Sequence, residues 1–176
     1  MTAAVLLIAT MLDTAATVAQ RNDACYALRG QRSADSVAAF ERALADRAVR
    51  TCAARDLREA SAVDSLIAAL GGTDADIQMA AARELGELRD TRALNALGRA
   101  AVDANVMVAA SATSALGAYE DKSALPYLLR AALQPNVAGM NALQQAARLQ
   151  DAAVLPIARK AIERGDIAAQ VVALTI

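Results

Sequence analysis

The sequence of 176 residues contains no histidine. Histidine is the commonest metal ligand and the side chain best suited to act as a general base near neutral pH. Without it, the hydroxyl and thiol groups of the chain have no such base to activate them as nucleophiles. The sequence therefore predicts a protein that is not an enzyme and that has no metal site and no cofactor.

Aromatic residues and an excess of positive charge are also missing. The chain has no tryptophan, one phenylalanine and three tyrosines, and its 18 Lys and Arg side chains are balanced by 19 Asp and Glu for a net charge of −1. Proteins that bind nucleic acids stack bases on aromatic rings and neutralise phosphates with a basic surface. We therefore expect no nucleic-acid partner.

Long hydrophobic runs are absent as well. The uncharged stretch from Ala3 to Leu12 is far shorter than the roughly 20 residues of a membrane-spanning helix, so we expect no stable membrane span. With the small residues Thr17 to Ala19 behind it, the stretch predicts a signal peptide at residues 1–19, cleaved after Ala19, and export to the periplasm or cell surface. No Lys or Arg precedes the stretch, so the alternative of a first helix in a cytoplasmic protein stays open.

The chain does contain a repeated helical pattern. Apolar residues follow helical spacing over residues 76–88 and again over 93–101, with a polar break between them. An acidic residue followed three and four positions later by two apolar residues recurs at steps of about 30 residues, at Glu59, Asp90, Asp121 and Asp151. We interpret these four acidic residues, the anchors of the repeat, as N-caps of the second helix of each hairpin.

A fixed period of this length indicates an α-solenoid, in which each helical hairpin buries its apolar face against its neighbours. The predicted fold is all-α, a right-handed α-α superhelix of about four complete hairpins and a terminal helix, within one domain at residues 20–176. The hairpins, of which the first is imperfect, are expected at residues 23–45, 47–71, 75–103, 105–134 and 137–164, followed by a lid at 167–176.

The segment Asp76 to Leu94, DIQMAAARELGELRDTRAL, closely resembles the HEAT repeat, in particular the short bacterial type often called PBS-lyase HEAT-like. Residues 105–133 are similar and residues 137–162 more weakly so. The resemblance implies an armadillo-like scaffold whose curved surface binds a protein partner, and it brings no motif of catalytic residues. An iron site of the kind found in deoxyhypusine hydroxylase-like relatives needs histidines, which this chain lacks.

The two cysteines, Cys25 and Cys52, are separated by nearly one repeat. Equivalent helices of neighbouring repeats pack about 8 to 10 Å apart, whereas a disulfide needs Cα atoms within about 7 Å. A bridge therefore forms only if both side chains face the seam between the helices. An even number of cysteines in an exported chain favours the disulfide, which would staple the N-terminal end. The alternative is two small buried hydrophobic residues.

Cations recur nine residues after three of the acidic anchors, at Arg99, Arg130 and Lys160. In solenoids the second helices line the concave face, so these three should form a basic ladder with steps of about 10 Å, with Tyr127 and Arg164 beside it. We predict that the basic ladder, these five residues together, binds an acidic or extended segment of a partner protein. The alternative is that each cation only complements the helix macrodipole and solvates the surface.

The sequence thus predicts a non-catalytic scaffold that binds a protein partner through its concave face. Two other functions stay open. One is an accessory subunit, or an enzyme of unknown reaction, that uses the solenoid as a rigid arm. The other is a structural repeat that associates with itself. A pocket with converging polar groups would favour the first, and an apolar terminal face would favour the second.

Overall fold

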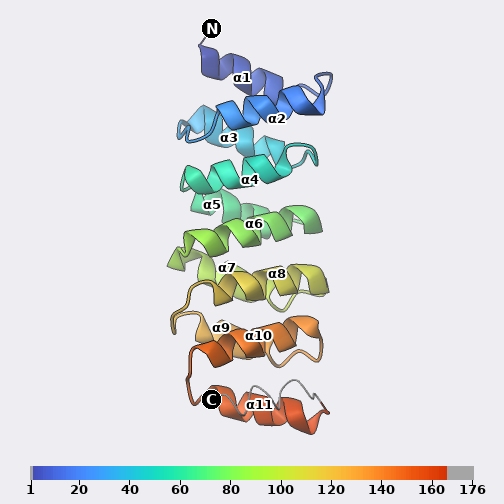
Figure 1. Cartoon of the computed structure of the whole chain (residues 1–176), viewed down its shortest axis with the longest axis vertical. Helices are drawn as coiled ribbons and strands as arrows, with labels where there is room; N and C mark the ends of the chain where they lie inside the picture. The colour runs from blue at the N-terminus through green and yellow to red at the C-terminus, as the bar shows by residue number, and fades with distance from the viewer. Residues whose placement is uncertain (1, 166–176) are drawn as a thin grey trace. The chain divides into compact units, whose positions relative to one another are not determined.

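A computed structural model describes residues 2–165 of the chain (Figure 1). These residues form eleven α-helices and one 3₁₀-helix, η1, without any strand, so the all-α prediction is confirmed. The helices are α1 Ala3–Leu12, α2 Val18–Ala27, α3 Ala34–Ala43, α4 Arg50–Glu59, α5 Val63–Leu70, α6 Ala75–Leu88, η1 Thr91–Ala93, α7 Leu94–Ala100, α8 Val106–Gly117, α9 Leu125–Ala131, α10 Val137–Arg148 and α11 Val154–Glu163. The lid predicted at residues 167–176 lies outside the described residues.

The chain divides into two compact units, Met1–Glu84 and Leu85–Ile176. Helix α6 begins in the first unit and ends in the second. In the first unit α1 packs on α2 and α3, and α4 packs on α2, α3 and α5. In the second unit α8 and α10 lie side by side, and α7 and α9 pack against them (Figure 1). Each unit therefore places alternate helices of the chain in the same layer.

The core is built from leucine and alanine. One leucine in most helices is fully buried, and small alanines fill the positions around it. Small residues let the helices approach closely: a Cβ atom added to Gly86 in α6 would lie 2.8 Å from the Cα of Ala115 in α8. The alanine-rich sequence thus produces thin, closely packed helices, as its composition suggests.

Four hairpins turn on a single residue in the left-handed backbone conformation. These residues, with φ between 48° and 55°, are Ser61, Arg89, Glu120 and Gln150. The last three directly precede the acidic anchors of their repeats, whereas Ser61 precedes Ala62. Glu59 is therefore not the equivalent of the other anchors. It is the last residue of α4, before the turn, and the interpretation of Glu59 as a cap of the following helix was wrong.

The other three anchors begin the turn before the second helix and do not cap the helix itself. The side chains of Asp90, Asp121 and Asp151 each accept a hydrogen bond from the backbone N–H two residues later, at 2.9, 2.6 and 3.0 Å. Asp90 caps η1 in this way, whereas α7, α9 and α11 follow alanine N-caps without a side-chain bond. The second helices therefore begin about one turn later in the chain than the N-cap interpretation expects.

The N-terminal stretch Ala3–Leu12 forms α1, and Met11 on this helix is fully buried. The buried Arg21 of α2 donates through Nε to the carbonyl oxygen of Met11 at 3.1 Å. Cleavage after Ala19 would cut α2 near its start. No helix within residues 2–165 is long and apolar enough to cross a membrane. A packed first helix agrees with the alternative interpretation of this stretch, in which it is not a signal peptide. Export stays a prediction.

Candidate functional site

The five residues of the basic ladder all belong to the second unit. Arg99 lies on α7, Tyr127 and Arg130 on α9, Lys160 on α11, and Arg164 directly follows α11. The four cations are exposed and Tyr127 is half-buried. Arg99, Arg130 and Lys160 each occupy the last turn of their helix, where a positive charge complements the macrodipole.

Two of the five residues, Tyr127 and Arg130, contact Gly98 of α7. A Cβ atom added to Gly98 would lie 2.1 Å from Cδ1 of Tyr127, so the tyrosine ring packs on the bare backbone of the glycine. Arg130 donates a hydrogen bond to the carbonyl oxygen of Gly98. Arg99 is the next residue along α7. An aromatic ring and two cations therefore share one short stretch of α7 and α9.

The basic ladder contains two kinds of cation. Arg130 is bound to the Gly98 carbonyl, and Arg164 donates to the carbonyl of Leu133, just beyond α9, at 2.9 Å. These two arginines tie one second helix to the one before it. Within residues 2–165 the side chains of Arg99 and Lys160 make no hydrogen bond or ion pair. Their charges face solvent. Of the four cations, these two alone are free, within the described part of the chain, for the predicted role of binding a partner and do not also join helices.

The first unit contains the disulfide. Cys25 of α2 and Cys52 of α4 are bonded to each other, with their Cα atoms 6.4 Å apart, and both residues are buried. The bridge joins two helices of the same layer, at the seam that the sequence prediction required. The Cys25–Cys52 disulfide is therefore confirmed.

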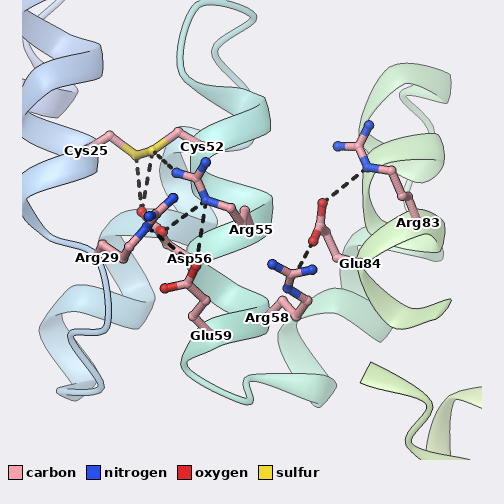
Figure 2. A network of polar contacts seen from close by, with 9 residues as sticks. All are labelled: Cys25, Arg29, Cys52, Arg55, Asp56, Arg58, Glu59, Arg83 and Glu84. Carbon is pink, nitrogen blue, oxygen red and sulfur yellow. Dashed lines mark hydrogen bonds and ion pairs between the residues drawn. A yellow bond between two sulfur atoms is a disulfide. The ribbon is translucent and has the colours of Figure 1, made fainter. Parts of the chain in front are cut away.

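A buried carboxyl group lies beside the bridge, and the sequence reasoning missed it. Asp56 follows Cys52 by one helical turn and is fully buried, with its Oδ2 3.5 Å from Sγ of Cys25 and 3.4 Å from Sγ of Cys52 (Figure 2). Burial raises the pKa of Asp56 to about 6, although the nearby Arg55 charge acts in the opposite direction. Because disulfide sulfurs carry no proton, these contacts are hydrogen bonds only when Asp56 itself is protonated. The i, i+4 spacing of Cys52 and Asp56 was the available signal.

Arg55 covers the outer side of this group. One of its terminal nitrogens lies 3.3 Å from Sγ of Cys52, and its Nε lies 3.7 Å from Asp56 and 3.8 Å from Glu59. The guanidinium carbon is 4.8 Å from the ring centre of Tyr26, a cation–π distance. Glu59 also pairs with Arg29 at 3.5 Å (Figure 2). The carboxylate that was predicted to cap a helix instead holds two arginines near the disulfide.

A second buried carboxylate lies farther along the first unit. Glu84 of α6 pairs with Arg58 of α4 at 3.3 Å and with its neighbour Arg83 at 3.2 Å (Figure 2). Only 6% of the Glu84 side chain is exposed. The ion pair between Arg58 and Oε2 joins α4 to α6, and Oε1 accepts a hydrogen bond from Arg83.

A shallow apolar groove lies between α3 and α5 in the first unit. Its volume is about 420 Å³, and small side chains such as Ala45, Ala68 and Ala69 form most of its wall. Its acidic residues are Glu41, which accepts a hydrogen bond from Ser65 at 2.5 Å, and Asp74, which pairs with Arg50 at 3.4 Å. Both acidic groups are thus already paired with a neighbouring side chain.

Comparisons with known proteins agree with this fold. Residues 63–148 match the family model of the HEAT repeats. One similar solved structure is "The structure of the complex of CpcE and CpcF of phycocyanin lyase from Nostoc sp. PCC7120", in which one chain is 25% identical to this protein with a TM-score of 0.58. The match covers 99% of this chain and 75% of that chain. No curated protein is similar enough in sequence to count as a match. The resemblance to HEAT repeats is therefore confirmed over residues 63–148, and the chain has the fold of a helical solenoid.

Proposed function

We propose that this protein is a non-catalytic scaffold that binds a protein partner through the second helices of its second unit. The observation that carries the proposal is that Tyr127 and Arg130 of α9 contact Gly98 of α7, directly beside the exposed Arg99. A half-buried aromatic ring beside two cations suits an acidic or extended peptide segment, because the ring offers apolar contact and the cations offer charge. Lys160 on α11 would extend the same surface.

The similar structure from Nostoc gives further support. That structure is a complex of two different proteins, so a chain of similar fold there assembles with another protein. By analogy, the partner of this scaffold would be a separate protein chain. Since the analogy rests on fold and on modest identity, it supports the class of partner and does not name one.

The test is cross-linked affinity capture of the tagged full-length chain from its native host. Arg99→Ser is the decisive variant, because Arg130→Ser would also remove the bond to Gly98. Arg148→Ser, at the end of α10 in the other helix layer, is the matched control. We expect a single stoichiometric partner whose capture falls about fivefold or more in Arg99→Ser, more strongly at low salt, and is unchanged in Arg148→Ser. Equal capture by the two variants would refute this site.

The second candidate function is an accessory subunit of an enzyme. Its support is that the similar structure is a phycocyanin lyase complex. The captured partner distinguishes the candidates: an enzyme whose turnover depends on this chain favours the accessory subunit. Recovery of the chain alone or with further copies of itself favours the self-associating repeat.

We also propose that the protein acts outside the cytoplasm, in the periplasm or at the cell surface. Support comes from the Cys25–Cys52 disulfide, since such bonds form and persist in oxidising compartments. Intact-mass measurement of the protein from its host tests export by this route, which predicts a chain beginning at Gln20. A chain that retains α1 would make the signal-peptide prediction wrong.

A further inference from the structure

The disulfide and Asp56 bring three metal-ligating side chains together in the core of the first unit. The two Sγ atoms and a carboxylate oxygen of Asp56 all lie within 4.8 Å of one another, and all three residues are buried. No histidine is needed for such a set, because thiolates and carboxylates are themselves zinc ligands. The prediction of no metal site was based on the absence of histidine, and that reason does not apply to this cluster.

Asp56 is difficult to explain by the disulfide alone. Its side chain is fully buried, and its Oδ1 has no hydrogen-bond partner within residues 2–165. Its Oδ2 faces two bridged sulfurs that have no proton to donate. A carboxyl group is costly to bury when its lost hydrogen bonds to water are only partly replaced, here by the ion pair with Arg55 at 3.7 Å. A cation between Oδ2 and the sulfurs would supply the missing interaction.

We propose that Cys25, Cys52 and Asp56 form a Zn²⁺ site when the disulfide is reduced. Sulfur ligands at about 2.3 Å and an oxygen ligand at about 2.0 Å in a tetrahedron lie roughly 3.5 Å from each other. The distances from Oδ2 of Asp56 to the two sulfurs are 3.5 and 3.4 Å. Once the covalent bond is broken, the sulfurs need to separate to about 3.8 Å, which rotation of the two side chains can provide. A water molecule would complete the four ligands.

The charges around the site are suited to a bound zinc ion. Two thiolates and one carboxylate carry three negative charges, and Zn²⁺ leaves a net charge of minus one. Arg55, with a terminal nitrogen 3.3 Å from Sγ of Cys52, supplies the balancing positive charge. Arg55 is itself held by Glu59 and by the Tyr26 ring. Because the charge of Glu59 is in turn balanced by Arg29, the whole cluster would be close to neutral, as a low-dielectric interior requires.

The disulfide and the zinc site exclude each other. A dithiol reductant gives two electrons and two protons to the sulfur–sulfur bond, which breaks into two thiols while the dithiol becomes a disulfide. A phosphine gives the two electrons and becomes a phosphine oxide with the oxygen of one water molecule, whose two protons complete the thiols. Zinc then displaces both thiol protons to solvent, together with the Asp56 proton where one is present. A small-molecule disulfide accepts two electrons from the thiolates and two protons from solvent and is reduced to two thiols, while the bridge is restored and the metal is released.

Cobalt titration of the full-length chain under anaerobic conditions tests the proposal. After reduction with tris(2-carboxyethyl)phosphine and removal of the phosphine, Co²⁺ is added as a spectroscopic probe. We expect one equivalent to bind, with thiolate-to-cobalt and tetrahedral absorption bands that one equivalent of Zn²⁺ abolishes. Bound Zn²⁺ should also protect both thiols from alkylation. The oxidised chain, which has no free thiolate, should give no such bands.

Two aspartate variants separate the site from general acidic binding. Asp56→Asn keeps both cysteines and should lower the Co²⁺ affinity at least about tenfold. Asp35→Asn, at an exposed position in the first turn of α3, should leave the affinity unchanged. Cys52→Ser should lose the thiolate bands, and Asp56→Asn keeps the test valid if that variant fails to fold.

The outcomes that would overturn the proposal are equally definite. One is a reduced chain that keeps its helical circular dichroism and binds no Co²⁺. Another is equal affinity in Asp56→Asn and the unchanged chain. A third is loss of helicity on reduction that Zn²⁺ does not restore, because the three ligands would then not be assembled without the bridge.

Discussion

Asp56 makes the stability of the oxidised protein depend on pH. Its pKa in the folded chain is about 6, against a usual value of 3.8, so the folded state holds a proton that the unfolded state has released between these values. Stability from this group is therefore present at low pH and lost as the pH rises through 6. Over this window we expect the free energy of unfolding to fall by about 3 kcal/mol.

Asp56→Asn should abolish most of that fall and stabilise the oxidised chain by about 2 kcal/mol at pH 7.5. Urea unfolding at a series of pH values measures both effects. The lowered pKa values of Asp46, Asp90, Asp121 and Asp151 do not interfere, because those groups change stability only below about pH 4. An unchanged pH slope in the variant would contradict the buried-acid account.

Gly98 is required by the Tyr127 ring and not by its backbone conformation. Alanine normally stabilises a helix relative to glycine by about 1 kcal/mol, yet here its Cβ would overlap Tyr127. Gly98→Ala should therefore lower the free energy of unfolding by about 2 kcal/mol. In the Gly98→Ala/Tyr127→Ala double variant the loss should be clearly smaller than the sum of the single losses.

Gly117→Ala is the control, because the added Cβ would meet only the flexible side chain of Gln145. It should change stability by less than about 0.5 kcal/mol. Thermal unfolding of the four variants measures the coupling. Additive effects of Gly98→Ala and Tyr127→Ala would show that the ring does not rest on this glycine.

At the scale of helices and turns, the left-handed residue of each hairpin costs stability because it is not glycine. Gln150, with φ of 48°, is exposed and lies just after α10. Gln150→Gly should raise the free energy of unfolding by about 0.5 to 1 kcal/mol. Gln144→Gly, inside α10, should lower it by a similar amount. Changes of the same sign in both variants, measured by thermal unfolding, would rule out this explanation.

The helices were predictable because apolar periodicity and a repeat near 30 residues determine which faces are buried. The register of the repeat was harder to predict from the sequence. Glu59 matches the spacing of the anchors, but the left-handed turn at Ser61 comes two residues after it, and no local pattern marks that position. Such a turn depends on how α4 and α5 pack, which is a tertiary property.

The candidate sites show the same division. The period aligned Arg99, Arg130 and Lys160 on successive second helices, as the structure has them. The period could not show that Arg130 donates to the Gly98 carbonyl, because this contact depends on the absence of a side chain at Gly98 on the neighbouring helix. Likewise, the contact of Asp56 with both sulfurs requires α2 and α4 to meet at one seam.

For the molecule as a whole, the disulfide stabilises one unit only. Cys25 and Cys52 close a loop of 27 residues in sequence separation inside Met1–Glu84. Reduction without added metal should therefore cost about 3 kcal/mol in that unit. Hydrogen exchange followed by mass spectrometry should show faster exchange in α2 and α4, with α8 and α10 unchanged as the internal control. Equal acceleration in all four helices would mean that the chain unfolds as one cooperative body.

The order in which helices pack has a consequence for biosynthesis. Among the described residues, substantial contacts join only helices that are neighbours or next neighbours in the chain. Such local contacts need little loop closure, so each hairpin can bury its apolar face soon after it leaves the ribosome. Both cysteines lie before the second unit begins. The bridge can therefore close before the second unit has folded.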